Sequence, residues 1–129
     1  MTTNLIPMLQ LLEESRDELV AFRLAGSIDR HDYDVMLPIL EEKIKQYGKI
    51  RVYAELQDAE EISLQALWED LKFDFRHAAD FKKVALVGNR KWLDWLTVMA
   101  SPFTTAKVKH FEVPDRDKAL EWVKADEAQ

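Results

Sequence analysis

The segment IRVYAEL, residues 50–56, decides the fold, because apolar side chains alternate with other side chains along it. Such alternation is typical of a β-strand with one well-buried face. Four apolar residues share that face: Ile50, Val52, Ala54 and Leu56. The later segment VALVG, residues 84–88, is apolar on both faces, which indicates a central parallel strand covered on two sides. Helical periodicity lies between the two strands, so together they predict an α/β sheet.

Outward from these strands, the chain predicts further strands and helices in alternation. Residues 8–12 and 19–24 are two short strands typical of an antiparallel hairpin. A helix begins near Asp29 and ends at Gly48, with Pro38 inside it removing one backbone hydrogen bond. The rest of the chain predicts an acidic loop at 57–61, helices at 64–78 and 91–100, a strand at 107–111 and a helix from Pro114. This order favours a mixed, mostly parallel sheet with covering helices, in a single domain over residues 1–129.

Composition excludes several classes of protein. With no cysteine, the chain has no disulfide and no thiolate metal site, which fits a reducing cytoplasm. The N-terminus has no basic residue before its apolar stretch, so it does not resemble a signal peptide. No apolar run reaches the roughly 18 residues that a membrane-spanning helix needs. The net charge of −6 argues against nucleic acid as a partner, because neutralising phosphates needs a basic surface. We therefore expect a cytoplasmic protein, with any membrane association peripheral and on the inner face.

One block of this acidic chain is basic, since residues 72–110 carry 8 basic and 3 acidic side chains. The two predicted helices beside or within this block have apolar residues outside their core-facing stripes. Phe73 lies opposite the stripe of one helix, and Leu93 and Val98 point away from the apolar face of the other. Apolar side chains flanked by cations suit an acyl chain with a charged head group, or an anionic membrane surface.

Five segments share their order and spacing with a known family: Gly26–Asp29, Trp68–Lys72, Val84–Gly88, His110–Phe111 and Ala119–Trp122. In these segments the chain resembles the SpoIIAA-like proteins, which are described as STAS or SEC14-type domains. The resemblance covers nearly the whole chain. It implies a STAS-like fold, with a mixed, mostly parallel five-stranded sheet and about four helices, mainly on one face. It also implies an apolar ligand or a membrane-associated role.

The resemblance does not extend to a phosphorylation switch. Anti-sigma-factor antagonists of this fold carry a phosphorylatable serine in a turn after the central strand. The corresponding residues here, 57–63, have no such turn, and Ser63 follows an acidic cluster that would repel an added phosphate. Partner switching through a phosphoserine is therefore not expected.

Catalytic and metal-binding motifs are not found in the sequence. His31, His77 and His110 lie on separate predicted elements and form no metal-ligand pattern, and no glycine-rich phosphate loop is present. We expect no catalytic residue, metal or cofactor. An enzyme would need an organised site, such as His77 or His110 beside a carboxylate in a pocket.

Two hypotheses of function remain. The first is a non-enzymatic module that binds an apolar or lipid-like ligand, or associates with an anionic membrane. Its binding residues are Phe73, Trp92, Leu93, Trp95, Val98 and Phe103, with the cations Lys72, Arg76, Arg90 and Lys91 for a head group. The second is a protein-interaction or regulatory module that uses the same apolar helices, as a homodimer or with a partner protein. The alternative to ligand binding at these residues is that Trp92, Trp95 and Phe103 are simply core and Phe73 is buried in a dimer interface.

Overall fold

The computed structural model describes residues 9–26, 30–59, 65–67, 69, 78–88, 98 and 106–125. These contain a five-stranded sheet with the strand order β1-β2-β3-β4-β5. The strands are β1 (Leu9–Leu11), β2 (Leu19–Gly26), β3 (Ile50–Ala59), β4 (Phe81–Gly88) and β5 (Lys107–Phe111). Strands β1 and β2 form an antiparallel hairpin, and β2, β3, β4 and β5 pair in parallel. The α/β class and the mixed, mostly parallel sheet are therefore as the sequence predicts.

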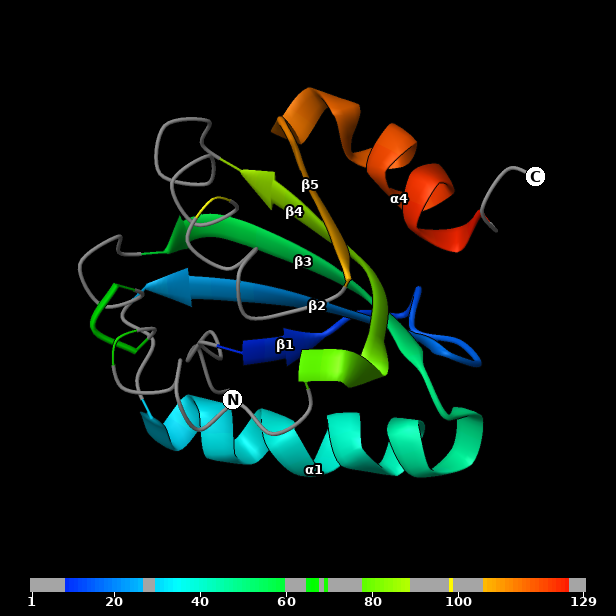
Figure 1. Ribbon diagram of the computed structural model, residues 1–129. Helices are drawn as coiled ribbons and strands as arrows, with labels where there is room; N and C mark the ends of the chain where they lie inside the picture. The colour runs from blue at the N-terminus through cyan, green and yellow to red at the C-terminus, as the bar shows by residue number, and fades with distance from the viewer. Residues whose placement is uncertain are drawn as a thin grey trace, which may run out of the picture.

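Helices α1 (Arg30–Tyr47) and α4 (Arg116–Lys124) lie on opposite sides of the sheet (Figure 1). This arrangement follows from β3, whose side chains point alternately to the two faces of the sheet. Each face of β3 packs in a separate hydrophobic cluster. Ile50, Val52, Ala54 and Leu56 face α1 and pack in a cluster with Leu40. Tyr53, on the opposite face of β3, packs with Ala119, Leu120 and Val123 of α4.

Helix α1 runs unbroken from Arg30 to Tyr47 with Pro38 inside it. The helix stops at Gly48, whose backbone has a φ of 85° and whose N–H donates to the carbonyl of Ile44 at 2.7 Å. A left-handed residue directly after a helix is the conformation that glycine adopts at least cost. The predicted stop at Gly48 is confirmed, whereas the predicted cap Asp29 lies outside the described residues.

Several predicted boundaries differ from the structure, and strand β2 runs to Gly26 where the prediction ended at residue 24. The expected loop at residues 57–61 is wrong in its first part, because β3 continues to Ala59, which pairs with Gly26 of β2. Strand β4 begins at Phe81, before the expected residue 84, because its first residue pairs with Ile50. Pro114 lies in a single 3-10 turn, η3 (Val113–Asp115), and α4 itself starts at Arg116. A second 3-10 turn, η1 (Ala78–Asp80), leads directly into β4.

Candidate anion-binding site

The binding residues predicted from the sequence lie almost entirely outside the described part of the chain. Val98 is the exception, and its side chain is 68% exposed. The other nine are not described: Lys72, Phe73, Arg76, Arg90, Lys91, Trp92, Leu93, Trp95 and Phe103. Their grouping into one site therefore stays a prediction.

Charged side chains lie buried on the face of the sheet that α4 covers. Arg51, Glu55 and Lys83 are only 6%, 5% and 5% exposed. Burying a charge is costly unless it is paired and hydrogen-bonded. Each of these three buried charges therefore needs polar partners within the protein.

Glu55 lies near the N-terminus of α4 and has a full set of donors. Its Oε1 accepts from Nε of Arg23 at 3.0 Å, and its Oε2 accepts from the Tyr53 hydroxyl at 2.6 Å. Arg116, the first residue of α4, donates to the same Oε2 from Nε at 2.9 Å and from Nη2 at 2.7 Å. The carboxylate thus joins β2, β3 and α4 in one network.

This network holds the Glu55 carboxyl group ionised. Burial raises its pKa, but the hydrogen bonds from Tyr53, Arg116 and Arg23 outweigh burial, so the pKa is lowered. The pKa of Tyr53 is raised, first by burial and then by the hydrogen bond that its hydroxyl donates to Glu55. A carboxylate with both oxygens occupied and a lowered pKa is poorly suited to act as a general base. We therefore assign Glu55 a structural role.

Arg51 and Lys83 lie at the other end of α4, beside its C-terminal carbonyl groups. Arg51 donates from Nη1 to the carbonyls of Val123 and Ala125, both at 2.8 Å. Lys83 donates to the carbonyls of Trp122 and Ala125, at 2.9 and 2.8 Å. The last carbonyls of a helix carry partial negative charge and have no partners within the helix. Arg51 and Lys83 therefore supply hydrogen-bond donors to the carbonyl groups at the C-terminus of α4.

A pocket of about 260 Å³ opens beside these two cations, at the N-terminal ends of β3, β4 and β5. Among the described residues, its lining consists of Lys49, Arg51, Phe81, Lys82, Lys83, Lys107 and Ala125. Five of these seven are basic and none is acidic. Glu18 lies beyond this lining and pairs with Arg51 and, at 3.0 Å, with Lys82. Hydrogen bonding to Arg51 is the main reason that the pKa of Glu18 is lowered. We call this the basic pocket.

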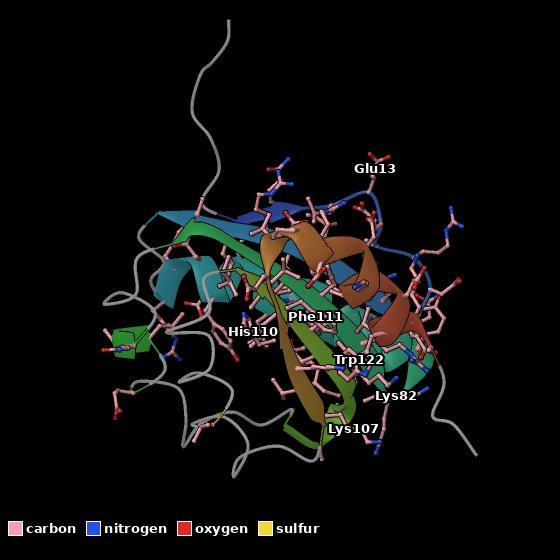
Figure 2. All side chains as sticks on the ribbon, turned by 90° about the horizontal axis from the view of Figure 1, so that it is seen from above. Glu13, Lys82, Lys107, His110, Phe111 and Trp122 are labelled. Atoms are coloured by element: carbon pink, nitrogen blue, oxygen red, sulfur yellow. The ribbon has the colours of Figure 1, made fainter. Side chains whose placement is uncertain are left out.

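Strand register gathers three lysines of the basic block on the side of the sheet that α4 covers. Lys83 of β4 pairs with Lys107 of β5, and Ala85 pairs with Lys109. The ammonium of Lys83 lies 4.8 Å from the centre of the Trp122 ring, and that of Lys109 lies 5.8 Å from it. Lys82, Lys107 and Trp122 lie close together in the view of Figure 2, with Glu13 on another part of the surface. We call Lys83, Lys107 and Lys109 the β4–β5 lysines.

A larger pocket, of about 650 Å³, lies beside the loop between β1 and β2. Its lining mixes four acidic side chains with three basic ones: Glu13, Glu14, Asp17 and Glu18 with Arg16, Arg51 and Lys124. Opposite charges at close range reduce the net field that a ligand would feel. The smaller basic pocket is therefore the stronger candidate, because its lining charges have one sign.

Sequence analysis missed the buried charges of the α4 face. Arg51 and Glu55 belong to the face of segment 50–56 opposite its apolar residues, and Lys83 directly precedes the apolar run at residues 84–88. The sequence nevertheless indicates that these charges are buried, because a central strand of a parallel sheet is covered on both faces. Charged residues on such a strand must therefore find partners.

A metal site is not found within the described ranges, because no group of His, Asp and Glu side chains there is arranged to hold a metal ion. His110 of β5 is half-buried, and its Nε2 lies 3.4 Å from the carbonyl oxygen of Gly88. No helix in these ranges is long and apolar enough to cross a membrane.

Comparison with known proteins adds two similarities. A protein-family model described as SpoIIAA-like matches residues 19–124. Among solved structures, the chain is similar to an uncharacterised protein of the DUF3478 family from Shewanella loihica PV-4, whose crystal structure has a SpoIIAA-like fold. The sequences are 31% identical, the TM-score is 0.70, and the match covers 95% of this chain and 98% of the other. The search of curated proteins gave no match.

Proposed function

Because this chain belongs to the SpoIIAA-like family, we propose that it is a non-enzymatic module that binds a lipid-like anionic ligand or an anionic membrane surface. The observation that carries this proposal is the gathering of the β4–β5 lysines by strand register. Lys107 and Lys109 of this set are exposed, and exposed lysines attract anionic lipid at about 1 kcal/mol each. Half-buried Trp122 and Phe111 lie among them, with ring centres 5.9 Å apart.

The apolar residues predicted from the sequence would supply the second part of the site. Phe73 and Leu93 belong to the connecting segments that precede β4 and β5. Phe81 and Lys107, the first residues of these two strands, line the basic pocket. A ligand that used both groups of residues would have a charged head and an apolar body, which is the chemistry of a lipid.

Co-sedimentation with vesicles tests the proposal. We expect the protein to sediment with vesicles that contain anionic lipid and not with neutral ones, and to be released at high salt because surface charges are screened. Phe73→Asp with Leu93→Asp should reduce binding in protein that is still folded by circular dichroism. The matched control is Leu11→Asp with Val35→Asp, since Leu11 and Val35 are exposed apolar residues at 52% and 51%.

Two results would contradict the proposal. One is unchanged vesicle binding by the folded Phe73→Asp, Leu93→Asp protein. The other is absence of binding to either vesicle type at any salt concentration. If the second result came with a sedimentation coefficient that rises with protein concentration, the protein-interaction function would replace the lipid-binding one.

A further inference from the structure

The basic pocket is small for a site that encloses a whole ligand. Its volume of about 260 Å³ lies below the range of about 300–1,000 Å³ that is typical of pockets for drug-sized molecules. Its walls are side chains of basic residues, with Phe81 as the one large apolar residue among them. Such a pocket suits a compact anionic group, with any apolar part of the same ligand outside it.

Cations occupy both the floor and the rim of this pocket. Arg51 and Lys83 are buried, and their hydrogen bonds to the carbonyls of α4 fix their positions. Lys49, Lys82 and Lys107 are exposed and stand at the starts of three neighbouring strands. An anion would therefore meet three accessible ammonium groups above two cations that are already oriented.

The charge balance favours a doubly charged anion. Within the described part of the chain, the lining residues carry five positive charges, and Glu18 supplies one negative charge through its pairs with Arg51 and Lys82. The C-terminus of α4 adds only about half a negative charge, spread over its carbonyls. A phosphate monoester carries about −1.5 to −2 at neutral pH, compared with −1 for a carboxylate.

We infer that the basic pocket binds a phosphate monoester group, with Lys49, Lys82 and Lys107 contacting its oxygens above Arg51 and Lys83. The group belongs to a lipid head group or is free phosphate, because the chemistry of the site is the same for both. Lysine serves as a point-charge binder of phosphate. This inference rests on the proposed function where the source is a lipid, and it names the head group that the lipid carries.

The test compares lipids at equal surface charge. Wild-type protein is titrated with phosphatidylcholine vesicles that contain either phosphatidate, which has a phosphate monoester, or phosphatidylserine, which does not. Isothermal titration with inorganic phosphate at constant ionic strength forms the third arm. We expect tighter binding to phosphatidate than to phosphatidylserine, and a loss on the order of tenfold or more in Lys49→Gln, Lys107→Gln protein.

The control variant is Lys45→Gln with Lys118→Gln, which removes the same charge from exposed sites on α1 and α4 outside the pocket. It should bind as the wild type does, within about twofold. Equal binding to the two lipids with no binding of inorganic phosphate would overturn the inference and leave the proposed function intact. An equal loss in both variants would also overturn it.

The phosphate arm distinguishes the two sources. Binding of inorganic phosphate that Lys49→Gln, Lys107→Gln abolishes, without binding to any vesicle, would support the pocket as a site for free phosphate. That same result would contradict the proposed membrane or lipid function. Preference for phosphatidate that the pocket variant abolishes would support both.

Discussion

Arg51 and Lys83 lie directly opposite each other on β3 and β4, and both donate to the carbonyl oxygen of Ala125 at 2.8 Å. Like charges in direct register normally destabilise a sheet. Here the carbonyl groups at the C-terminus of α4 lie against both cations, and Glu18 bonds Arg51 from the hairpin side. Packing of the C-terminus of α4 against the sheet therefore buries the two cations and at the same time provides their hydrogen-bond acceptors.

Removing Lys83 tests this relationship. Lys83→Met should lower the free energy of unfolding by about 1–3 kcal/mol, because the carbonyls of Trp122 and Ala125 lose a buried donor. Lys45→Met, at an exposed position on α1, should change it by less than about 0.5 kcal/mol. Urea unfolding followed by circular dichroism measures both. Equal stability of Lys83→Met and wild type would show that relief of repulsion with Arg51 offsets the lost bonds.

Glu55→Gln should be more damaging than any exposed Glu→Gln change. The substitution leaves Arg23 and Arg116 without their shared carboxylate, and both arginine side chains are about two-thirds buried. We expect a loss of about 2–4 kcal/mol, near the range for breaking a buried pair and reduced by partial exposure. Glu42→Gln, on the exposed side of α1, is the matched control. A loss no larger than that of the control would contradict the structural role assigned to Glu55.

The lowered pKa values of Glu18 and Glu55 give the stability a pH dependence with a definite sign. A carboxyl group whose pKa is lower in the folded state stabilises the protein above its unfolded-state pKa, which is about 4. This stabilisation is lost as the pH falls through the folded-state pKa. The free energy of unfolding should therefore drop below about pH 4, and the difference between wild type and Glu55→Gln should shrink there. A constant difference between about pH 7 and pH 3 would contradict this linkage.

Pro38 is exposed inside α1, so replacing it isolates the effect of its ring on the helix. Proline in a helix interior costs about 3 kcal/mol through a lost hydrogen bond and a steric clash. Part of that cost is offset because proline restricts the unfolded chain by up to about 1 kcal/mol. Pro38→Ala should therefore raise the free energy of unfolding by about 1–2 kcal/mol, measured by thermal and urea unfolding. A decrease in the free energy of unfolding would mean that the proline ring makes stabilising contacts in the folded protein.

Gly48 offers a test of backbone strain without steric conflict. Its φ is 85°, and a Cβ built there would meet no atom within 4 Å. Gly48→Ala should cost about 1 kcal/mol from the left-handed backbone alone, and Gly48→Asn should cost less, because asparagine tolerates this region better. Urea unfolding of the two variants checks the order. Equal costs for the two residues would contradict an origin in backbone conformation.

Local patterns were sufficient to predict most of the described fold. Alternation placed β3, the run at residues 84–88 identified most of β4, and helical spacing with a glycine stop gave α1. The errors concern strand ends, such as the start of β4 at Phe81, which depends on pairing with Ile50 of β3. Periodicity within one segment contains no information about the length of its neighbour.

The candidate site could be predicted only in part. The excess of basic residues in one block predicts a head-group site at Lys72, Arg76, Arg90 and Lys91, and these four residues lie outside the described part of the chain. The structure gathers two further lysines of the same block, Lys82 and Lys107, with Lys49 from an acidic stretch of the chain. These residues become neighbours because three parallel strands begin at the same edge of the sheet.

By itself, the sequence determined the α/β class, the parallel strands around β3 and membership of the SpoIIAA-like family, because these follow from periodicity and motif order. Only the tertiary structure decided which charges are buried and what they contact. Arg51 and Lys83 find their partners at the end of α4, 72 and 39 residues further along the chain. Such pairings depend on strand register and on where a distant helix ends, and both are fixed only when the whole sheet packs.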